Sequence, residues 1–266
     1  VKISLKEVTK STVTFETVMT LSEKSTLTKL TRIYSGKKQI DFETSIDWHE
    51  KHKLLKAGFD LDINATGLRS EIQFGSIVRP VWKTNSFEEA KFEVSNQRWS
   101  DYSEPGYGAA ILNDSKYGIN ALGNLVTLTL QKSGTHPDPM ADEGVHSFKY
   151  SILLHSAFSS DSVISKAYSF NTEPRVYRGK LIEAPVKVSS SHVVIESLKI
   201  AEDDDGLIIR LYECEGTGCH CSLKASFDAK AEIVNFLEEP QGGCDLNDLY
   251  FKAFEIKTIR LYRVGK

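Results

Sequence analysis

Apolar and polar residues alternate along most of this 266-residue chain. In residues 40–48 the large apolar side chains fall on even positions and the acidic ones on odd positions. The same period of two recurs at 59–63, 126–130 and 148–158. Successive side chains of a β-strand point to opposite faces, whereas a helix repeats its apolar positions every three or four residues. The pattern therefore predicts strands that bury one face.

Two stretches rich in threonine and other β-branched residues, 9–21 and 27–34, also predict strands. One helical turn is predicted at 86–90, where Ser86 would cap the first turn and Glu89 would complete a capping box. Because the strands follow one another without long helical crossovers, the sheets should be mainly antiparallel. The predicted fold class is all-β, with a large antiparallel β-sandwich as its main body.

A change of composition marks residues 175–191, which carry Pro185 and a run of serines, as linkers often do. Three later stretches predict a second set of strands: 193–198, 207–211 and 254–261. We therefore place a domain boundary at about residue 180. It separates a large β-sandwich at 1–180 from a small β-domain at 181–266.

Composition excludes several classes of partner. Hydrophobic residues make up 40% and charged residues 26%, with a formal net charge of -3, so no basic surface for nucleic acid or an anionic membrane is predicted. No apolar run approaches the roughly 20 residues that span a bilayer, and residues 1–10 lack the apolar core of a signal peptide. The chain opens in a predicted strand without an initiating methionine, as a segment of a longer chain would.

The cysteines are confined to the last quarter of the sequence, at Cys214, Cys219, Cys221 and Cys244. A disulfide-stapled secreted protein would spread them through a small fold, so we predict a reducing, cytoplasmic location. These four side chains, with His220, could form a tetrahedral zinc site or a disulfide, but the spacing is not the usual paired CxxC. The sequence favours free thiols and leaves zinc and a disulfide as alternatives.

Residues 47–52 (DWHEKH) could supply metal ligands or an acid–base group through His49, Glu50 and His52. The spacing differs from the helical HExxH motif of zinc proteases, and the segment ends a predicted strand. We therefore interpret it as a charged strand end in which Trp48 is packed inward.

Residues 136–146 (HPDPMADEGVH) bring imidazole and carboxylate groups together, and a cation could be held there. Ligand order and spacing match no metal loop of known geometry, and two prolines already explain a rigid turn. The favoured interpretation is a structured loop on the rim of the sandwich.

Residues 97–108 place aromatic rings beside carboxylates, which is the composition of sugar-binding sites. Asp101 and Glu104 could also be a hydrolytic pair, but neither has a predicted partner that would tune its pKa. Two acids in one loop are common on any surface, so an ordinary surface loop is the favoured interpretation; contact with a sugar or another domain is the alternative, ahead of catalysis. The candidate carbohydrate-contact residues, taken from this loop and the rim loop, are Trp99, Asp101, Tyr102, Tyr107, Asp138 and Asp142.

The sequence contains no GxSxG elbow, phosphate-binding loop or dinucleotide fingerprint, and hence no complete catalytic constellation. Several stretches of the sequence, taken together and in their order along the chain, resemble the C-terminal region of the glycoside hydrolase family 38 α-mannosidases. The stretches are 41–60, 71–79, 91–99, 106–118, 137–146, 201–213 and 254–261.

This resemblance implies a β-sandwich of the galactose-mutarotase type (a supersandwich) followed by a small β-sandwich domain. Family members are retaining exo-α-mannosidases whose N-terminal domain, resembling an α/β-barrel, carries zinc, the aspartate nucleophile and the acid–base residue. Those motifs match no position here, so the chain would hold no cofactor, and zinc is expected in the catalytic domain. The implied partners are that domain and mannose-containing glycans, with a homo-oligomer possible. The insert at 214–221 departs from the family pattern.

Two alternatives remain open at this stage. A self-sufficient mutarotase-like epimerase would need a histidine base opposite a glutamate, such as His155 or His146 with Glu71 or Glu104. A carbohydrate-binding module would need affinity for mannose without turnover.

Overall fold

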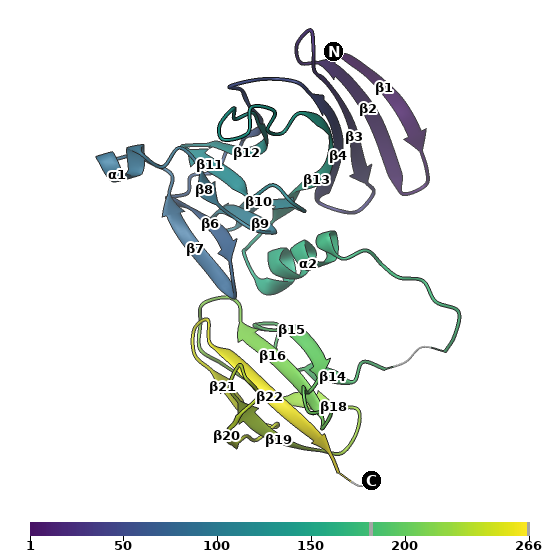
Figure 1. Ribbon diagram of the computed structural model, residues 1–266, viewed down its shortest axis with the longest axis vertical. Helices are drawn as coiled ribbons and strands as arrows, with labels where there is room; N and C mark the ends of the chain where they lie inside the picture. The colour runs from purple at the N-terminus through teal and green to yellow at the C-terminus, as the bar shows by residue number, and fades with distance from the viewer. Residues whose placement is uncertain (181–182, 265–266) are drawn as a thin grey trace. The chain divides into compact units, whose positions relative to one another are not determined.

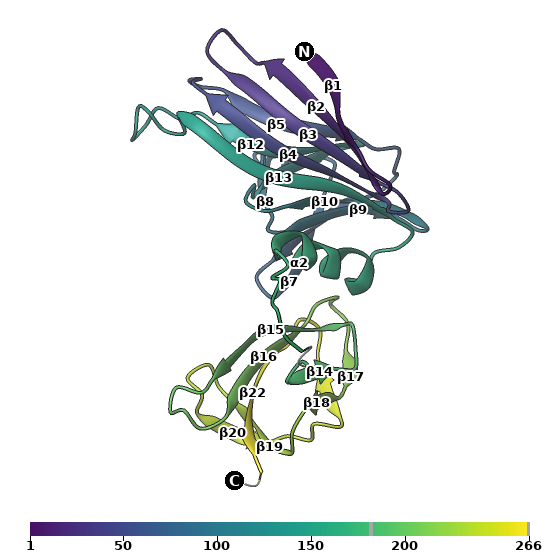
Figure 2. The same cartoon turned by 90° about the vertical axis from the view of Figure 1, so that its right-hand side faces the viewer.

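The computed structural model describes residues 1–180 and 183–264. Its contacts group the chain into two units, 1–72 with 77–173 and 73–76 with 174–266. Strands dominate both units (Figures 1 and 2), and the all-β prediction is confirmed. The predicted boundary between 180 and 181 adjoins residues 181–182, which lie outside the described part, and stays a prediction.

The first unit is built on a nine-stranded sheet, in which the seven pairings from the first to the eighth strand in spatial order are antiparallel. In spatial order its strands are β1 (Lys2–Val8), β2 (Thr12–Thr20), β3 (Thr26–Tyr34), β4 (Gln39–Trp48), β13 (Gly144–His155), β10 (Tyr107–Asn113), β9 (Trp99–Glu104), β6 (Gly67–Ile72) and β7 (Gly75–Pro80). Three of the neighbouring pairs, β4 with β13, β13 with β10 and β9 with β6, join strands that are not consecutive in the chain, so residues far apart in sequence share one surface.

A smaller sheet of four strands covers part of the inner face of the large one. Its strands, in spatial order, are β5 (Leu54–Asp60), β12 (Leu125–Lys132), β11 (Gly118–Leu122) and β8 (Val94–Ser95). The predicted alternation is confirmed here, because Ile46 and Trp48 are buried in the shared core while Ser45 and Asp47 are exposed. The first unit is therefore a β-sandwich, as the sequence indicated.

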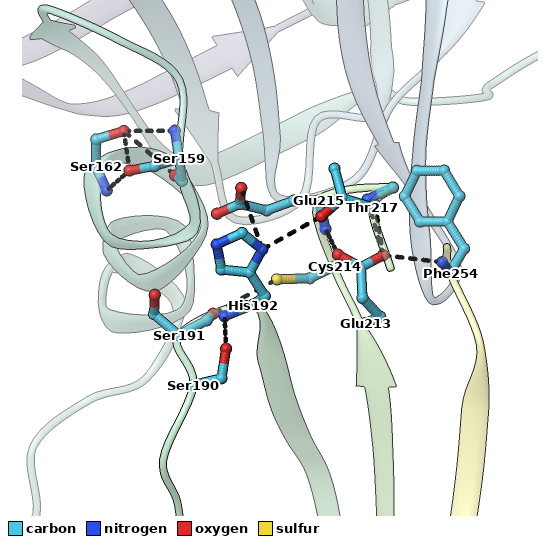
Figure 3. Close-up of polar contacts among 11 residues, drawn as sticks. Ser159, Ser162, Ser190, Ser191, His192, Glu213, Cys214, Glu215, Thr217 and Phe254 are labelled. Atoms are coloured by element: carbon cyan, nitrogen blue, oxygen red, sulfur yellow. Dashed lines mark hydrogen bonds and ion pairs between the residues drawn. The ribbon is translucent and has the colours of Figure 1, made fainter. Parts of the chain in front are cut away.

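A helical segment covers the opposite face of β9 and β10. It consists of a π-helical turn (Ser160–Ile164), capped by Ser159, and helix α2 (Ser165–Asn171) (Figure 3). Covered on both faces, β10 is buried from Gly108 to Asn113. This segment was not predicted from the sequence. Phe158, assigned to a strand by its spacing, lies beyond the end of β13 and packs on Trp99 at 5.2 Å between ring centroids.

The predicted helical turn is present as α1 (Ser86–Glu89), but its capping was predicted wrongly. The N-cap is Asn85, whose side-chain oxygen accepts a hydrogen bond from the Glu88 amide at 3.0 Å. Because Ser86 lies inside the helix, the capping box of Ser86 and Glu89 does not form. Asparagine and serine are equally good N-cap residues, so the sequence alone did not show whether the helix begins after Asn85 or after Ser86.

A buried ion pair fastens α2 to the sheet. The Arg98 guanidinium donates to the Glu71 carboxylate at 2.7 and 3.0 Å, and the Arg98 amide donates to it at 2.7 Å. The same guanidinium lies 3.8 Å from the ring centroid of Tyr168 on α2 and donates to its hydroxyl at 3.0 Å. Glu71 is 2% exposed, so its charge depends on these donors.

The second unit is the predicted small β-sandwich. A five-stranded sheet contains β15 (Val193–Ile200), β16 (Leu207–Glu213), β22 (Ile256–Arg263), β19 (Ala229–Val234) and β20 (Pro240–Gly243). Two short ladders accompany it, β14 (Val186–Val188) with β18 (Leu223–Ala225), and β17 (Cys219–Cys221) with β21 (Leu249–Phe251). Their shared core includes Ile209, Ile259 and Phe251, all fully buried. In neither described range does a helix combine the length and apolar character needed to cross a membrane.

Replacing Arg98 by alanine should lower the free energy of unfolding by about 2–3 kcal/mol, because it leaves the buried Glu71 carboxylate without its main donor. Urea unfolding followed by tryptophan fluorescence measures this. Lys91→Ala is the matched control, since it removes the exposed pair with Glu88 and should change stability by no more than about 0.5 kcal/mol. Equal effects of the two substitutions would contradict the assigned role of Arg98.

Candidate functional site

Two clusters noted in the sequence meet at one end of the first unit. In the β4–β13 ladder Trp48 lies opposite Gly144, which places residues 49–52 beside the loop at 133–143. The loop turns back into β13 through positive φ angles of 61° at Asp142 and 124° at Gly144. We call this end of the unit, formed by residues 21–25, 49–52 and 133–143, the rim.

The rim contains a hollow of about 780 Å³. Its lining residues are Ser22, Glu23, Lys24, His49, Glu50, Lys51, Met140 and Glu143. Glu50 organises the hollow by accepting hydrogen bonds from the hydroxyls of Ser22 and Ser25, the latter at 2.8 Å. These hydrogen bonds lower the pKa of Glu50, so it is held as a carboxylate and is not a proton donor near neutral pH.

His49 and His52 of the rim and His146 of β13 have separate partners. His49 contacts Asp47 at 2.8 Å, His52 contacts the Thr135 hydroxyl at 3.4 Å, and His146 contacts the Asp142 carbonyl at 2.9 Å. Throughout residues 1–180 and 183–264, no group of three or more histidine, cysteine or acidic side chains is placed to hold a metal ion. The described residues therefore do not fit zinc.

The six carbohydrate-contact candidates fall into two sets. Trp99, Asp101 and Tyr102 belong to β9, a central strand rather than a loop, and are 1–3% exposed. The Tyr102 hydroxyl donates to the Gly123 carbonyl at 2.8 Å inside the core. In this structure these three side chains do not reach solvent.

Tyr107, Asp138 and Asp142 are exposed, but they do not share a site. Gly108, next to Tyr107, pairs with His155 at one end of β13, whereas Gly144 begins β13 beside Asp142. Twelve residues of extended strand separate those ends by roughly 35 Å. One sugar ring therefore cannot contact both loops. Sugar contact by the six stays untested, and Tyr107 and the loop of Asp138 and Asp142 are competing positions for it.

A histidine–carboxylate pair does exist, although the sequence did not indicate which residues form it. His155 Nε2 lies 2.6 Å from Asp101 Oδ1, and the Ser103 hydroxyl donates to the same carboxylate. Both partners are buried, on neighbours of β10. A side chain at Gly108 would meet the His155 ring at 2.4 Å, so the pair requires a glycine there. The partners are 54 residues apart, and no local motif joins them.

The residues suggested for the epimerase alternative have other partners in this structure. Glu71 is engaged by Arg98, and Glu104 accepts a hydrogen bond from the Asn64 amide at 2.6 Å. His155 pairs with Asp101 in the interior instead of facing a glutamate across an open surface.

In the second unit, a buried carboxylate shapes the start of the cysteine-bearing insert (Figure 3). Glu213 Oε1 accepts from the Glu215 amide at 2.8 Å. Glu213 Oε2 accepts from the amides of Gly216 at 2.8 Å, Thr217 at 3.2 Å and Phe254 at 2.9 Å. Four backbone donors thus fold the loop around one side chain, which is a structural arrangement with no acceptor left for a ligand.

The four cysteines are free thiols, as the sequence favoured. Burial raises the pKa of Cys214 to about 12 and that of Cys221 to about 11. It also raises the pKa of Cys219 and Cys244. Cys214 Sγ lies 3.8 Å from the Ser191 carbonyl, to which it donates (Figure 3). The thiols are therefore protonated near neutral pH and lack the thiolate character of reactive cysteines.

Both units of the chain match domains of a known protein family. Residues 3–140 match the description "Glycosyl hydrolases family 38 C-terminal domain". Residues 192–259 match "Glycosyl hydrolases family 38 C-terminal beta sandwich domain".

The chain is also similar to parts of individual proteins named as alpha-mannosidases. The chain is 35% identical over 261 residues to alpha-mannosidase 2C1 of Homo sapiens, covering 92% of this chain and 25% of that protein. It is 35% identical over 245 residues to alpha-mannosidase G of Dictyostelium discoideum, covering 86% of this chain and 22% of that protein. The crystal structure of an alpha-mannosidase from Enterococcus faecalis V583 matches with a TM-score of 0.82 at 17% identity, over 97% of this chain and 35% of that chain. This chain thus spans about a quarter of the length of the curated relatives.

Glu213→Gln should destabilise the protein by about 3 kcal/mol, because an amide nitrogen replaces an acceptor that binds buried backbone donors. Thermal unfolding measures the loss. The exposed Glu202→Gln is the control and should change stability by less than about 0.5 kcal/mol. A Glu213→Gln protein as stable as the control would contradict the structural role of this carboxylate.

Alkylation with iodoacetamide at pH 8 should proceed at least about 100-fold more slowly at Cys214 in the folded protein than in guanidinium chloride. A thiol of pKa about 12 is ionised at pH 8 to roughly one part in ten thousand, against roughly one in ten at the ordinary value of 9.0. Peptide mapping by mass spectrometry gives the rate at each cysteine. Burial raises the pKa of Cys214 only in the folded state. The protonated Cys214 thiol therefore favours folding fully below pH 9, and this stabilisation is lost as the pH rises from 9 toward 12. Rapid alkylation of folded Cys214 would contradict the assigned burial.

Proposed function

Because the chain belongs to glycoside hydrolase family 38, we propose that it is the non-catalytic C-terminal part of a retaining exo-α-mannosidase that hydrolyses terminal α-mannosides. The observation that carries this proposal is the match of both units to C-terminal domains of that family, within relatives about four times as long. Its role is to support the catalytic domain of the same protein.

The chemistry of the described residues supports a role without catalysis. Glu71 is neutralised by Arg98, Asp101 is buried against His155, and Glu213 is saturated by backbone amides. A glycosidase needs two carboxyl groups that can reach a glycosidic bond and that differ in protonation. We assign the nucleophile, the acid–base residue and the zinc ion to the part of the enzyme that lies outside this chain.

The rim is the part of this chain that we assign to the sugar site. It is concave, and the exposed carboxylates of Asp138 and Asp142 can accept hydroxyl hydrogens, while Met140 offers an apolar contact. Tyr107 lies at the other end of β13 and serves as an internal comparison. Four protonated thiols fit a reducing compartment, and we propose a cytoplasmic enzyme.

This chain alone should show no turnover of an aryl α-mannoside, whereas the complete protein from the same reading frame should hydrolyse it. The separate N-terminal portion should be inactive or unstable and should regain activity when it is produced together with this chain. Release of the aryl group, measured by absorbance, tests all three. Turnover by highly purified chain alone, or a complete protein without mannosidase activity, would contradict the proposal.

In the complete protein, Asp138→Ala and Asp142→Ala should raise KM for a mannoside by about three- to ten-fold, through loss of one hydrogen bond to a charged acceptor. Tyr107→Ala, at the opposite end of β13, should leave KM unchanged. If all three variants behave alike, the rim does not line the sugar site.

A further inference from the structure

Strand β1 has an apolar face that nothing described covers. Ile3, Leu5 and Val8 pair with Thr17, Phe15 and Val13 of β2. They therefore share one face, while Lys2, Ser4 and Glu7 occupy the other. The three apolar residues are 67%, 59% and 62% exposed.

The ladder shows that this is the inner face of the sandwich. From Leu5 the pairing runs across the sheet through Phe15, Thr31 and Phe42 to Tyr150. Phe42 stacks on Tyr150 at 4.9 Å and lies 6.3 Å from Phe59 of β5, in the core between the sheets. The same face is thus buried at β4 and β13 and exposed at β1.

The inner face of the larger sheet changes from buried to exposed where the smaller sheet ends. Its last strand, β5, pairs among the described residues only with β12, and Phe59 places β5 over β4 and β13. Strands β1 to β3 extend beyond it, to one side of β12, β11 and β8 (Figure 1). The larger sheet therefore has an apolar overhang at β1, which consists of Ile3, Leu5 and Val8, and among the described residues the outer edge of β5 has no paired strand.

We infer that further strands of the same protein, upstream of Val1, extend the smaller sheet from β5 and cover the overhang. The first strand added at β5 would receive backbone hydrogen bonds. Further strands beside it would reach β1, which lies three strands beyond β4, and would bury Ile3, Leu5 and Val8. The inference rests on the proposed function, in which this chain is a segment of a protein about four times as long.

A second copy of the chain fits these surfaces less well. The free edge of β1 carries lysines at positions 2 and 6 and a bulge between Leu5 and Glu7, features that hinder pairing between two edges. A copy stacked on the overhang would leave the edge of β5 unpaired. Upstream strands satisfy both surfaces without a symmetric partner.

Hydrogen exchange of β5 (Leu54–Asp60), followed by mass spectrometry, compares this chain with the complete protein. We expect β5 amides to exchange at least about 100-fold more slowly in the complete protein, because the free edge becomes paired. Leu5→Lys should reduce that protection at least about ten-fold in the complete protein and leave exchange of β5 in this chain unchanged. Ser4→Lys, on the other face of β1, is the matched control and should have no effect in either. If Leu5→Lys prevents the complete protein from folding, Leu5→Ala gives the same comparison with a smaller loss.

Equal exchange of β5 in the two proteins would overturn the inference, and so would a complete protein that begins at Val1. Protection that appears in this chain alone and grows with its concentration would show that a second copy covers the surface, and would also overturn it. A failure of this inference can be distinguished from a failure of the proposed function. Hydrogen exchange measures strand pairing in the sandwich, whereas release of the aryl group measures mannosidase activity.

Discussion

The inner face of a nine-stranded sheet can be buried only where a second layer lies over it, and most features of the first unit depend on this constraint. Where the smaller sheet is present, Phe42, Phe59 and Tyr150 form a packed aromatic group between the two layers. On the opposite face, the π-helical turn and α2 provide a third layer over β9 and β10. At β1, where neither layer is present, apolar side chains meet solvent.

Layering also explains which partners the buried acidic residues have. A carboxylate between layers is stable only if donors replace the water it has lost. Arg98 meets this need for Glu71, and backbone amides meet it for Glu213. Asp101 is held by His155 and Ser103. Each of these groups holds two elements together, and none presents a free acid or base to a substrate.

The rim combines polar side chains with access to solvent and a concave surface. It is built from segments that the register of β4 and β13 brings together, and Glu50 links the turn at 21–25 to the end of β4. In the proposed mannosidase this end of the sandwich carries contacts to sugar, whereas the interior carries stability. The division follows from burial, since aspartate occurs both at the rim, as Asp138 and Asp142, and in the interior, as Asp101.

Much of the fold was determined by the sequence itself. The alternation at 40–48 and 126–130 predicted strands with one buried face, because side-chain direction in a strand depends only on local geometry. The ordered resemblance to family 38 likewise predicted the architecture of both units. The helix at 165–171 escaped prediction, since its stability comes from packing on β10 rather than from its own pattern. The tertiary structure alone decided that Asp101 pairs with His155, that Trp99 and Tyr102 are interior, and that Tyr107 and Asp142 lie at opposite ends of β13. Those facts depend on strand order and register, which bring together residues that are far apart in the chain and that no local pattern relates.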